Sequence, residues 1–207
     1  MKRPAVALIF MLLLAVVPSS RSALSPRYYL IDTDPVIVRS AAACPFSLGI
    51  GKIRAPSRYR DQIVYRTSDY DLGFYEYSKW AESPDEMARR ALKNIADRSG
   101  LFRRADYNEM LPLADLVLEG ELGSFDQVIA GEKTYAACEM TLFLLDGKSS
   151  APLWSFTAAS EVRQEKDGEF AAAMSAAVKT AVEDALGDLE RSGVLSRPEV
   201  KKVISHQ

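Results

Sequence analysis

Hydrophobic and polar residues alternate along several stretches of the chain, in the pattern of strands that bury one face. Residues 46–50 alternate Phe, Leu and Ile with Ser and Gly, and glycines at such positions indicate a bulge or another backbone close by. Aromatic and β-branched runs on either side of a polar turn predict a hairpin over 62–66 and 74–80. Further strands are predicted at 28–31, 36–38, 116–122, 138–144 and 154–162. The last three follow one another, which favours an antiparallel meander.

Two stretches have the helical period instead. Ser83 as cap, a following proline and Glu86 as capping-box partner predict a helix over 84–98. Gly100 is expected to close that helix in a left-handed conformation. Apolar residues at helical spacing predict a last helix over 169–191. The pattern therefore predicts a two-layer α+β fold, with a mostly antiparallel sheet of about five to six strands and both amphipathic helices on one face.

The N-terminus is typical of an exported protein. Lys2 and Arg3 precede a charge-free stretch over 5–17, which is shorter than the roughly 20 apolar residues of a membrane-spanning helix and fits a signal peptide. Small residues at both recognition positions predict cleavage after Ser22, and an uncleaved N-terminal anchor is the alternative. The expected organisation is a signal peptide at 1–22, a single periplasmic domain at 23–193 and a flexible tail at 194–207.

Composition argues against several classes of function. The 26 basic and 28 acidic residues are interspersed, whereas a duplex-binding protein carries a basic patch, so we expect no nucleic-acid partner. His206, the only histidine, lies in the expected tail, where no imidazole can be held for a catalytic dyad or a zinc site. With no phosphate-binding loop either, we expect a non-enzymatic protein without cofactor or metal. Cys44 and Cys138 could form a disulfide in an oxidising compartment or remain reduced and packed.

The stretch from Tyr59 to Trp80 stands out, because it interleaves seven aromatic residues with arginines. Protein interfaces enrich aromatic residues and arginine. Strands also favour aromatic residues for packing, so the core is the alternative destination of each. The candidate partner-binding residues are Tyr59, Arg60, Gln62, Val64, Tyr65 and Trp80.

Several of these segments resemble one family. Residues 28–32 read Tyr-Tyr-Leu-Ile-Asp, 60–66 read Arg-Asp-Gln-Ile-Val-Tyr-Arg, and 80–82 read Trp-Ala-Glu before the first predicted helix. The central strand at 114–125 and Trp154 before an alanine-rich last helix fit the same order of elements. On these motifs the chain resembles the ABC-type transport auxiliary lipoprotein component family, to which the paraquat-inducible protein C lipoprotein belongs.

The resemblance implies a periplasmic partner of an ABC transporter complex that contains a mammalian-cell-entry (MCE) domain protein and moves lipids or other hydrophobic compounds. It implies a small α+β fold and no ATP binding. The chain departs from the family in two places: it lacks the family's proline before Gln62, and no cysteine follows the charge-free stretch, since the first is Cys44. Membrane contact is therefore expected only through partners or an uncleaved N-terminus. The alternative function is a soluble periplasmic carrier that binds a lipid or another apolar ligand between helices and sheet.

Overall fold

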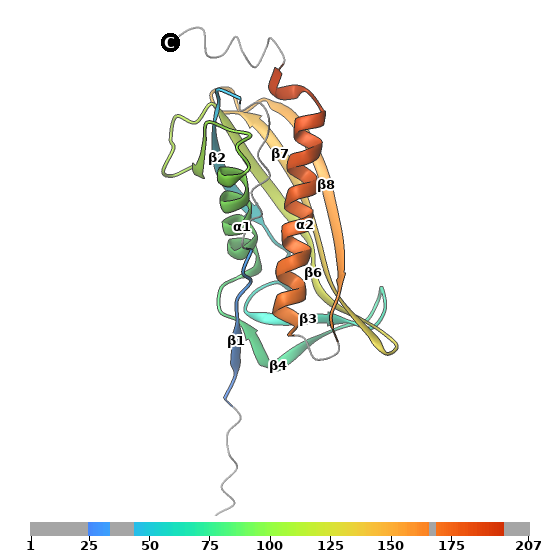
Figure 1. The fold of residues 1–207 in the computed structure, drawn as a ribbon. Helices are drawn as coiled ribbons and strands as arrows, with labels where there is room; N and C mark the ends of the chain where they lie inside the picture. The colour runs from blue at the N-terminus through green and yellow to red at the C-terminus, as the bar shows by residue number, and fades with distance from the viewer. Residues whose placement is uncertain (1–24, 34–43, 166–168, 197–207) are drawn as a thin grey trace, which may run out of the picture.

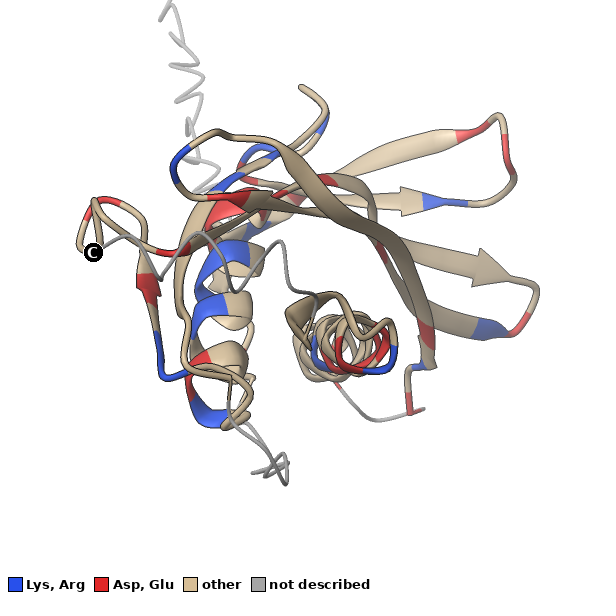
Figure 2. Ribbon diagram, turned by 90° about the horizontal axis from the view of Figure 1, so that it is seen from above, with Lys and Arg blue, Asp and Glu red and all other residues tan. Residues whose placement is uncertain are grey.

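A curved sheet of eight strands carries two helices on one face (Figure 1), and the sheet bends around α2 when seen from above (Figure 2). The computed structural model describes residues 25–33, 44–165 and 169–196. The strands are β1 (Arg27–Tyr29), β2 (Ser47–Arg54), β3 (Gln62–Arg66), β4 (Leu72–Trp80), β5 (Arg104–Tyr107), β6 (Leu116–Ala130), β7 (Lys133–Asp146) and β8 (Pro152–Arg163); the helices are α1 (Pro84–Arg98), α2 (Phe170–Arg191) and the short 3₁₀ helix η1 (Val194–Ser196). The predicted α+β class is confirmed. The sheet, however, has more strands than expected and mixes parallel with antiparallel pairs.

Strand β6 is the centre of the sheet. One edge of β6 pairs along its whole length with β7, and β7 pairs with β8, so the predicted antiparallel meander is confirmed. The other edge of β6 is shared by two strands. Its first half pairs with β2 and its second half with β3, both in parallel. The helices cover the part of the sheet formed by β2 and β5 to β8, which with the helices we call the body. Strands β1, β3 and β4 form a second group at one end of the molecule (Figure 1).

The glycines of β2 lie where neighbouring groups approach the backbone closely, as the sequence predicts. A Cβ atom on Gly49 would lie 2.5 Å from Oδ1 of Asn108, and one on Gly51 would lie 2.7 Å from Cγ of Glu119. The register of β2 against β6 also shifts just after this stretch. The glycines thus allow a β-bulge where a side chain would collide with its neighbours.

Helix α1 has the predicted bounds, but it begins differently from the prediction. Ser83 is the N-cap residue and its side chain makes no capping hydrogen bond, so the predicted capping box with Glu86 was wrong. Pro84 occupies the first turn and has no N–H group, which leaves one donor fewer for a cap to satisfy. Gly100, just past the helix, has a φ of 69°, which confirms the left-handed closure.

Helix α2 packs its alanine-rich face on β7 and β8, and its small side chains allow a close approach to the sheet. Gly193 ends the helix with a φ of 66°. Val194 and Leu195, which the sequence assigned to a flexible tail, instead form η1 and are buried in the core. The start of the tail was therefore predicted too early, because two apolar side chains directly after the glycine can still reach the core.

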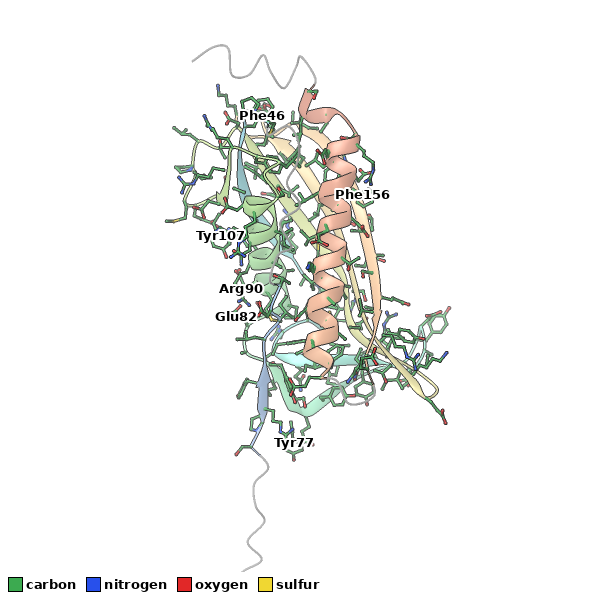
Figure 3. All side chains as sticks on the ribbon, in the orientation of Figure 1. Phe46, Tyr77, Glu82, Arg90, Tyr107 and Phe156 are labelled. Carbon is green, nitrogen blue, oxygen red and sulfur yellow. The ribbon has the colours of Figure 1, made fainter. Side chains whose placement is uncertain are left out.

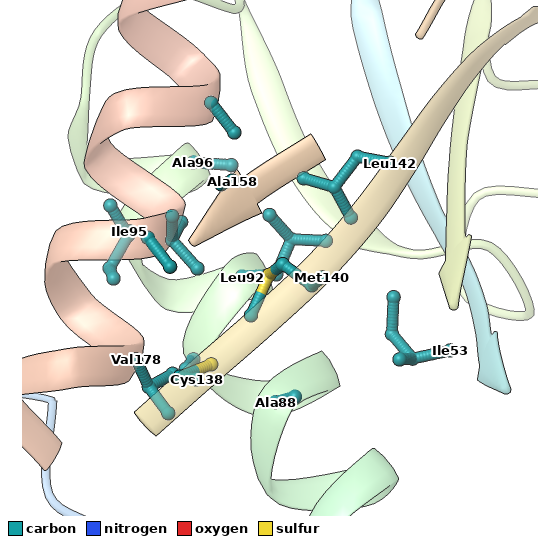
Figure 4. Packing of buried hydrophobic residues seen from close by; sticks show 14 of the residues in the cluster. Ile53, Ala88, Leu92, Ile95, Ala96, Cys138, Met140, Leu142, Ala158 and Val178 are labelled. Atoms are coloured by element: carbon teal, nitrogen blue, oxygen red, sulfur yellow. The ribbon is translucent and has the colours of Figure 1, made fainter. Parts of the chain in front are cut away.

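The core lies between the helices and the sheet as one continuous cluster. Figure 4 shows Leu92 and Ile95 of α1, Met140 and Leu142 of β7 and Val178 of α2 within it. Strand β5 was not predicted, because it is short and polar residues occupy most of its positions. The predicted signal peptide and the predicted strand at 36–38 lie outside the described residues. In the part of the chain that the structure describes, no helix combines the length and apolar character needed to cross a membrane.

Candidate functional site

A cleft of about 280 Å³ opens where the N-terminal end of α2 meets the β1, β3 and β4 group. It is assembled from five strands or helices and the connection before α2, which are far apart in the sequence. The lining residues are Arg27, Tyr29, Ile63, Tyr75, Ser78, Gln127, Gln164, Glu169 and Phe170. We call this feature the cleft.

An irregularity in β4 gives the cleft its shape. Gln62 lies opposite Lys79, while Val64 lies opposite Phe74, so two steps along β3 correspond to five along β4. The extra residues of β4 cannot all join the ladder, and they bulge. Tyr75, within the bulge, lines the cleft.

A chain of neutral hydrogen bonds spans the lining of the cleft. The hydroxyl of Tyr75 donates to Oε1 of Gln127 at 2.5 Å, and Nε2 of Gln127 donates to Oε1 of Gln164 at 2.9 Å. Burial raises the pKa of the Tyr75 hydroxyl, which therefore stays a neutral donor at physiological pH. Gln127 is only 8% exposed, so these bonds satisfy an amide that would otherwise be costly to bury.

Aromatic rings support the cleft from behind. The ring of Phe170 lies 5.8 Å from that of Trp80, which makes an edge contact with Phe125 at 5.3 Å. Tyr65 and Tyr75 form a tilted pair with ring centroids 5.0 Å apart. Such contacts hold rings in fixed positions beyond what burial alone achieves, so the cleft has a preformed wall.

The six predicted partner-binding residues are divided between core and surface. Tyr59, Val64 and Trp80 are buried and serve the core. Arg60 is exposed, while Gln62 and Tyr65 are half-buried; these last three are the members that a partner can reach.

Sequence reasoning missed other residues of the cleft, notably Tyr29, Gln127 and Phe170. One signal was present for Gln127. It follows Phe125 at the alternating spacing that marks the buried face of β6, so a polar side chain stands where an apolar one is expected. The other two come from the ends of β1 and α2 and carry no such signal.

A buried polar cluster lies on the opposite face of β6, since adjacent strand residues point to opposite faces. Asp126 is 2% exposed; it accepts a hydrogen bond of 2.6 Å from the Tyr59 hydroxyl and lies 2.7 Å from Nε of Arg66. The Ser124 hydroxyl donates to the same carboxylate at 3.2 Å. Burial, reinforced by the carboxylate, raises the pKa of Tyr59 to about 12. This cluster fastens β3 and the loop before it to β6.

Among the residues that the structure describes, the cysteines and the potential metal ligands form no further site. Cys44 and Cys138 are both free thiols. Burial raises the pKa of Cys138 to about 12 and also raises that of Cys44, so neither is an activated nucleophile. Within residues 25–33, 44–165 and 169–196, no three histidine, cysteine or acidic residues are grouped so that they could hold a metal ion. The arrangement around the cleft is suited to noncovalent binding.

Comparison with solved structures places the fold among known ones. Protein XCC0632 from Xanthomonas campestris, described as a DUF330 family member, is 17% identical and superimposes with a TM-score of 0.67 over 82% of this chain and 96% of that chain. An uncharacterized protein is 19% identical, with a TM-score of 0.58 over 81% of this chain and 98% of that one. At such identities the likeness concerns the fold alone. A search of curated proteins found no match. The family model of the ABC-type transport auxiliary lipoprotein component matches residues 28–185, and the chain therefore belongs to this family, whose members are auxiliary components of ABC-type transport.

Proposed function

We propose that this chain is a non-enzymatic periplasmic subunit of an ABC-type transport system that moves lipids or other hydrophobic compounds, and that it docks on the MCE-domain protein of that system. The observation that carries the proposal is the family match over residues 28–185. That match includes the helix-covered body and the strands around the cleft, so the likeness extends to the candidate site. The N-terminal sequence, typical of a signal peptide, supports a periplasmic place of action.

The cleft and the reachable residues beside it are the proposed docking site. Arg60, Gln62 and Tyr65 lie on or next to β3, whose neighbour β4 contributes Tyr75 to the cleft. Tyrosine and arginine are among the residue types that interface centres favour. Because aromatic packing already fixes the wall of the cleft, a partner would bind without the entropic cost of ordering that wall.

The polarity of the cleft and its surroundings favours this proposal over a lipid carrier. The cleft holds about 280 Å³, and an adjoining hollow of about 640 Å³, which shares Gln127 and Gln164, is lined only by polar and charged side chains. Arg27 and Glu169 place opposite charges in the lining of the cleft, and the lining amides of Gln127 and Gln164 are polar. A cleft of this kind fits a side chain of a protein partner better than the acyl chains of a lipid.

The test is a binding measurement between this protein and the MCE-domain protein of the same transport system, by calorimetry or co-purification. Tyr65→Ala should weaken binding about tenfold or more, as expected for a central interface tyrosine. Tyr70→Ala is the matched control, because Tyr70 lies in the turn of the same hairpin and is 99% exposed. Unchanged affinity in a folded Tyr65→Ala variant would refute the docking site, and no binding by the unaltered protein would refute the partnership.

A further inference from the structure

Exposed apolar side chains gather at one end of the molecule. Among the described residues, eight large hydrophobic side chains are exposed, and six of them belong to β1, β4 or their immediate surroundings: Tyr28, Leu30, Tyr70, Leu72, Phe74 and Tyr77. The other two, Met110 and Leu113, lie in the loop before β6. Figure 3 shows Tyr77 at the lower end of the molecule, where Figure 1 places β1 and β4. We call Tyr28, Leu72, Phe74 and Tyr77 the rim.

The rim is separate from the cleft. The four rim residues are 42% to 63% exposed, and none of them lines the cleft, which takes Tyr75 from the same strand. The rim residues of β4 run from Leu72 to Tyr77, so they span roughly 17 Å along the strand. Exposed apolar side chains grouped in this way on a folded protein mark a surface that contacts something.

Charge does not select a strongly charged partner for the rim. Lys79 of β4 forms an ion pair with Asp61 at 2.7 Å, so those two charges cancel. The exposed Arg27 and Arg60 are accompanied by the exposed Asp69, Asp71 and Glu76, so charges of both signs surround the rim. A surface of tyrosine, phenylalanine and leucine among charges of both signs has the composition that settles at the interface between lipid headgroups and acyl chains, where tyrosine keeps its hydroxyl in water.

The sequence before the rim indicates the same occupant. The described chain begins at residue 25, next to β1. The charge-free stretch over 5–17 precedes it, and nine residues lie between Val17 and Arg27, so these two residues are at most about 35 Å apart when the chain is extended. A lipid layer that holds this stretch as an uncleaved anchor, the alternative to cleavage after Ser22, is therefore within reach of the rim.

We infer that the rim rests on a lipid surface, with the side chains of Phe74, Tyr77, Leu72 and Tyr28 at the headgroup level and the helix-covered body pointing away from it. The contact is independent of the proposed docking site, because it uses different side chains. It would hold the folded domain of the auxiliary subunit at a membrane through its own side chains.

The experiment measures how close two positions of the full chain come to lipid. Tyr77→Trp places a fluorescent reporter on the rim, and Leu113→Trp places one in a loop outside the rim that is 90% exposed. Each variant is mixed with phosphatidylcholine and phosphatidylethanolamine vesicles in which part of the lipid carries bromine, a short-range quencher. Of the native tryptophans, Trp80 is buried and Trp154 is half-buried on β8. The unaltered chain measures the quenching that these two contribute to both variants.

Quenching at position 77 should exceed that at position 113 by about twofold or more, because the rim residue lies at the headgroup level. Adding Leu72→Ser and Phe74→Ser to the Tyr77→Trp chain should reduce quenching to the level at position 113, while thermal unfolding shows that the fold persists. Equal quenching at both positions, or none at either, would overturn the inference and leave the rim to a protein partner.

Discussion

Replacing Arg66 by alanine tests how strongly the group of β1, β3 and β4 is fastened to the rest of the sheet. The guanidinium lies 2.7 Å from the carboxylate of Asp126, whose side chain is 3% exposed. Removing one partner of a buried ion pair costs about 3–5 kcal/mol, because the remaining charge stays buried without compensation. Asp126 keeps its hydrogen bonds from Tyr59 and Ser124, so we expect a loss near the lower value, about 3 kcal/mol. Against a typical domain stability of about 5–15 kcal/mol, such a loss is large.

The assay is equilibrium urea unfolding followed by circular dichroism, with Arg54→Ala as the matched control. Arg54 and Glu121 form an ion pair of 3.5 Å whose side chains are 74% and 57% exposed, and pairs of this kind contribute about 0–1 kcal/mol. Tyr59→Phe should cost about 1.5–3 kcal/mol, and the double variant should be non-additive, since both groups serve one carboxylate. If Arg66→Ala and Arg54→Ala lost equal stability, the description of Asp126 as a buried anchor would be wrong.

Three further predictions concern pH, glycine packing and thiol reactivity. Because the pKa of Tyr59 is raised from 10.0 to about 12, this residue's contribution to the free energy of unfolding should be intact below pH 10 and fall by up to about 3 kcal/mol as the pH rises to 12; unfolding titrations should show a smaller fall for Tyr59→Phe. A Cβ on Gly120 would lie 2.8 Å from a backbone carbonyl oxygen, so Gly120→Ala should lower the free energy of unfolding by about 1–3 kcal/mol. Gly187→Ala, within α2, should instead raise it by up to about 1 kcal/mol. Melting temperatures that moved in the same direction in both variants would contradict this. Iodoacetamide and mass spectrometry should modify the half-buried Cys44 before the buried Cys138, since only exposed thiolates react readily; protection of both in the folded protein, relieved by reductant alone, would instead reveal a disulfide.

Local signals in the sequence were sufficient for the helices and the meander. Pro84, the apolar stripe after it and Gly100 act within a few residues of one another, so α1 was bounded correctly. The parallel pairs of β6 with β2 and β3 could not be predicted, because strands distant in sequence leave no local trace of which edge they share. This is also why the sheet was expected to be smaller and more antiparallel than it is.

The candidate site was predicted only in part, for a related reason. Aromatic side chains at Tyr59 and Trp80 have the same composition whether they face a partner or the core, and only the tertiary structure shows that both are buried. The cleft depends on the bulge in β4 and on Gln127 lining the same cavity as Phe170. No local pattern in the sequence indicates that these two residues come together. What the sequence could locate was the segment of the chain, and what it could not decide was which side of each strand faces inward.

The shared edge of β6 divides the sheet into two mechanical units. β2 and β3 pair with successive parts of β6 but not with each other. The group of β1, β3 and β4 is therefore joined to the body through the second half of β6, the Asp126 cluster and the rings behind the cleft. Hydrogen exchange should accordingly show the amides of β3 and β4 opening together, before those of β6 and β7. An assembly that pulls or twists at this end would therefore deform the β3–β4 hairpin first and leave the helix-covered body intact.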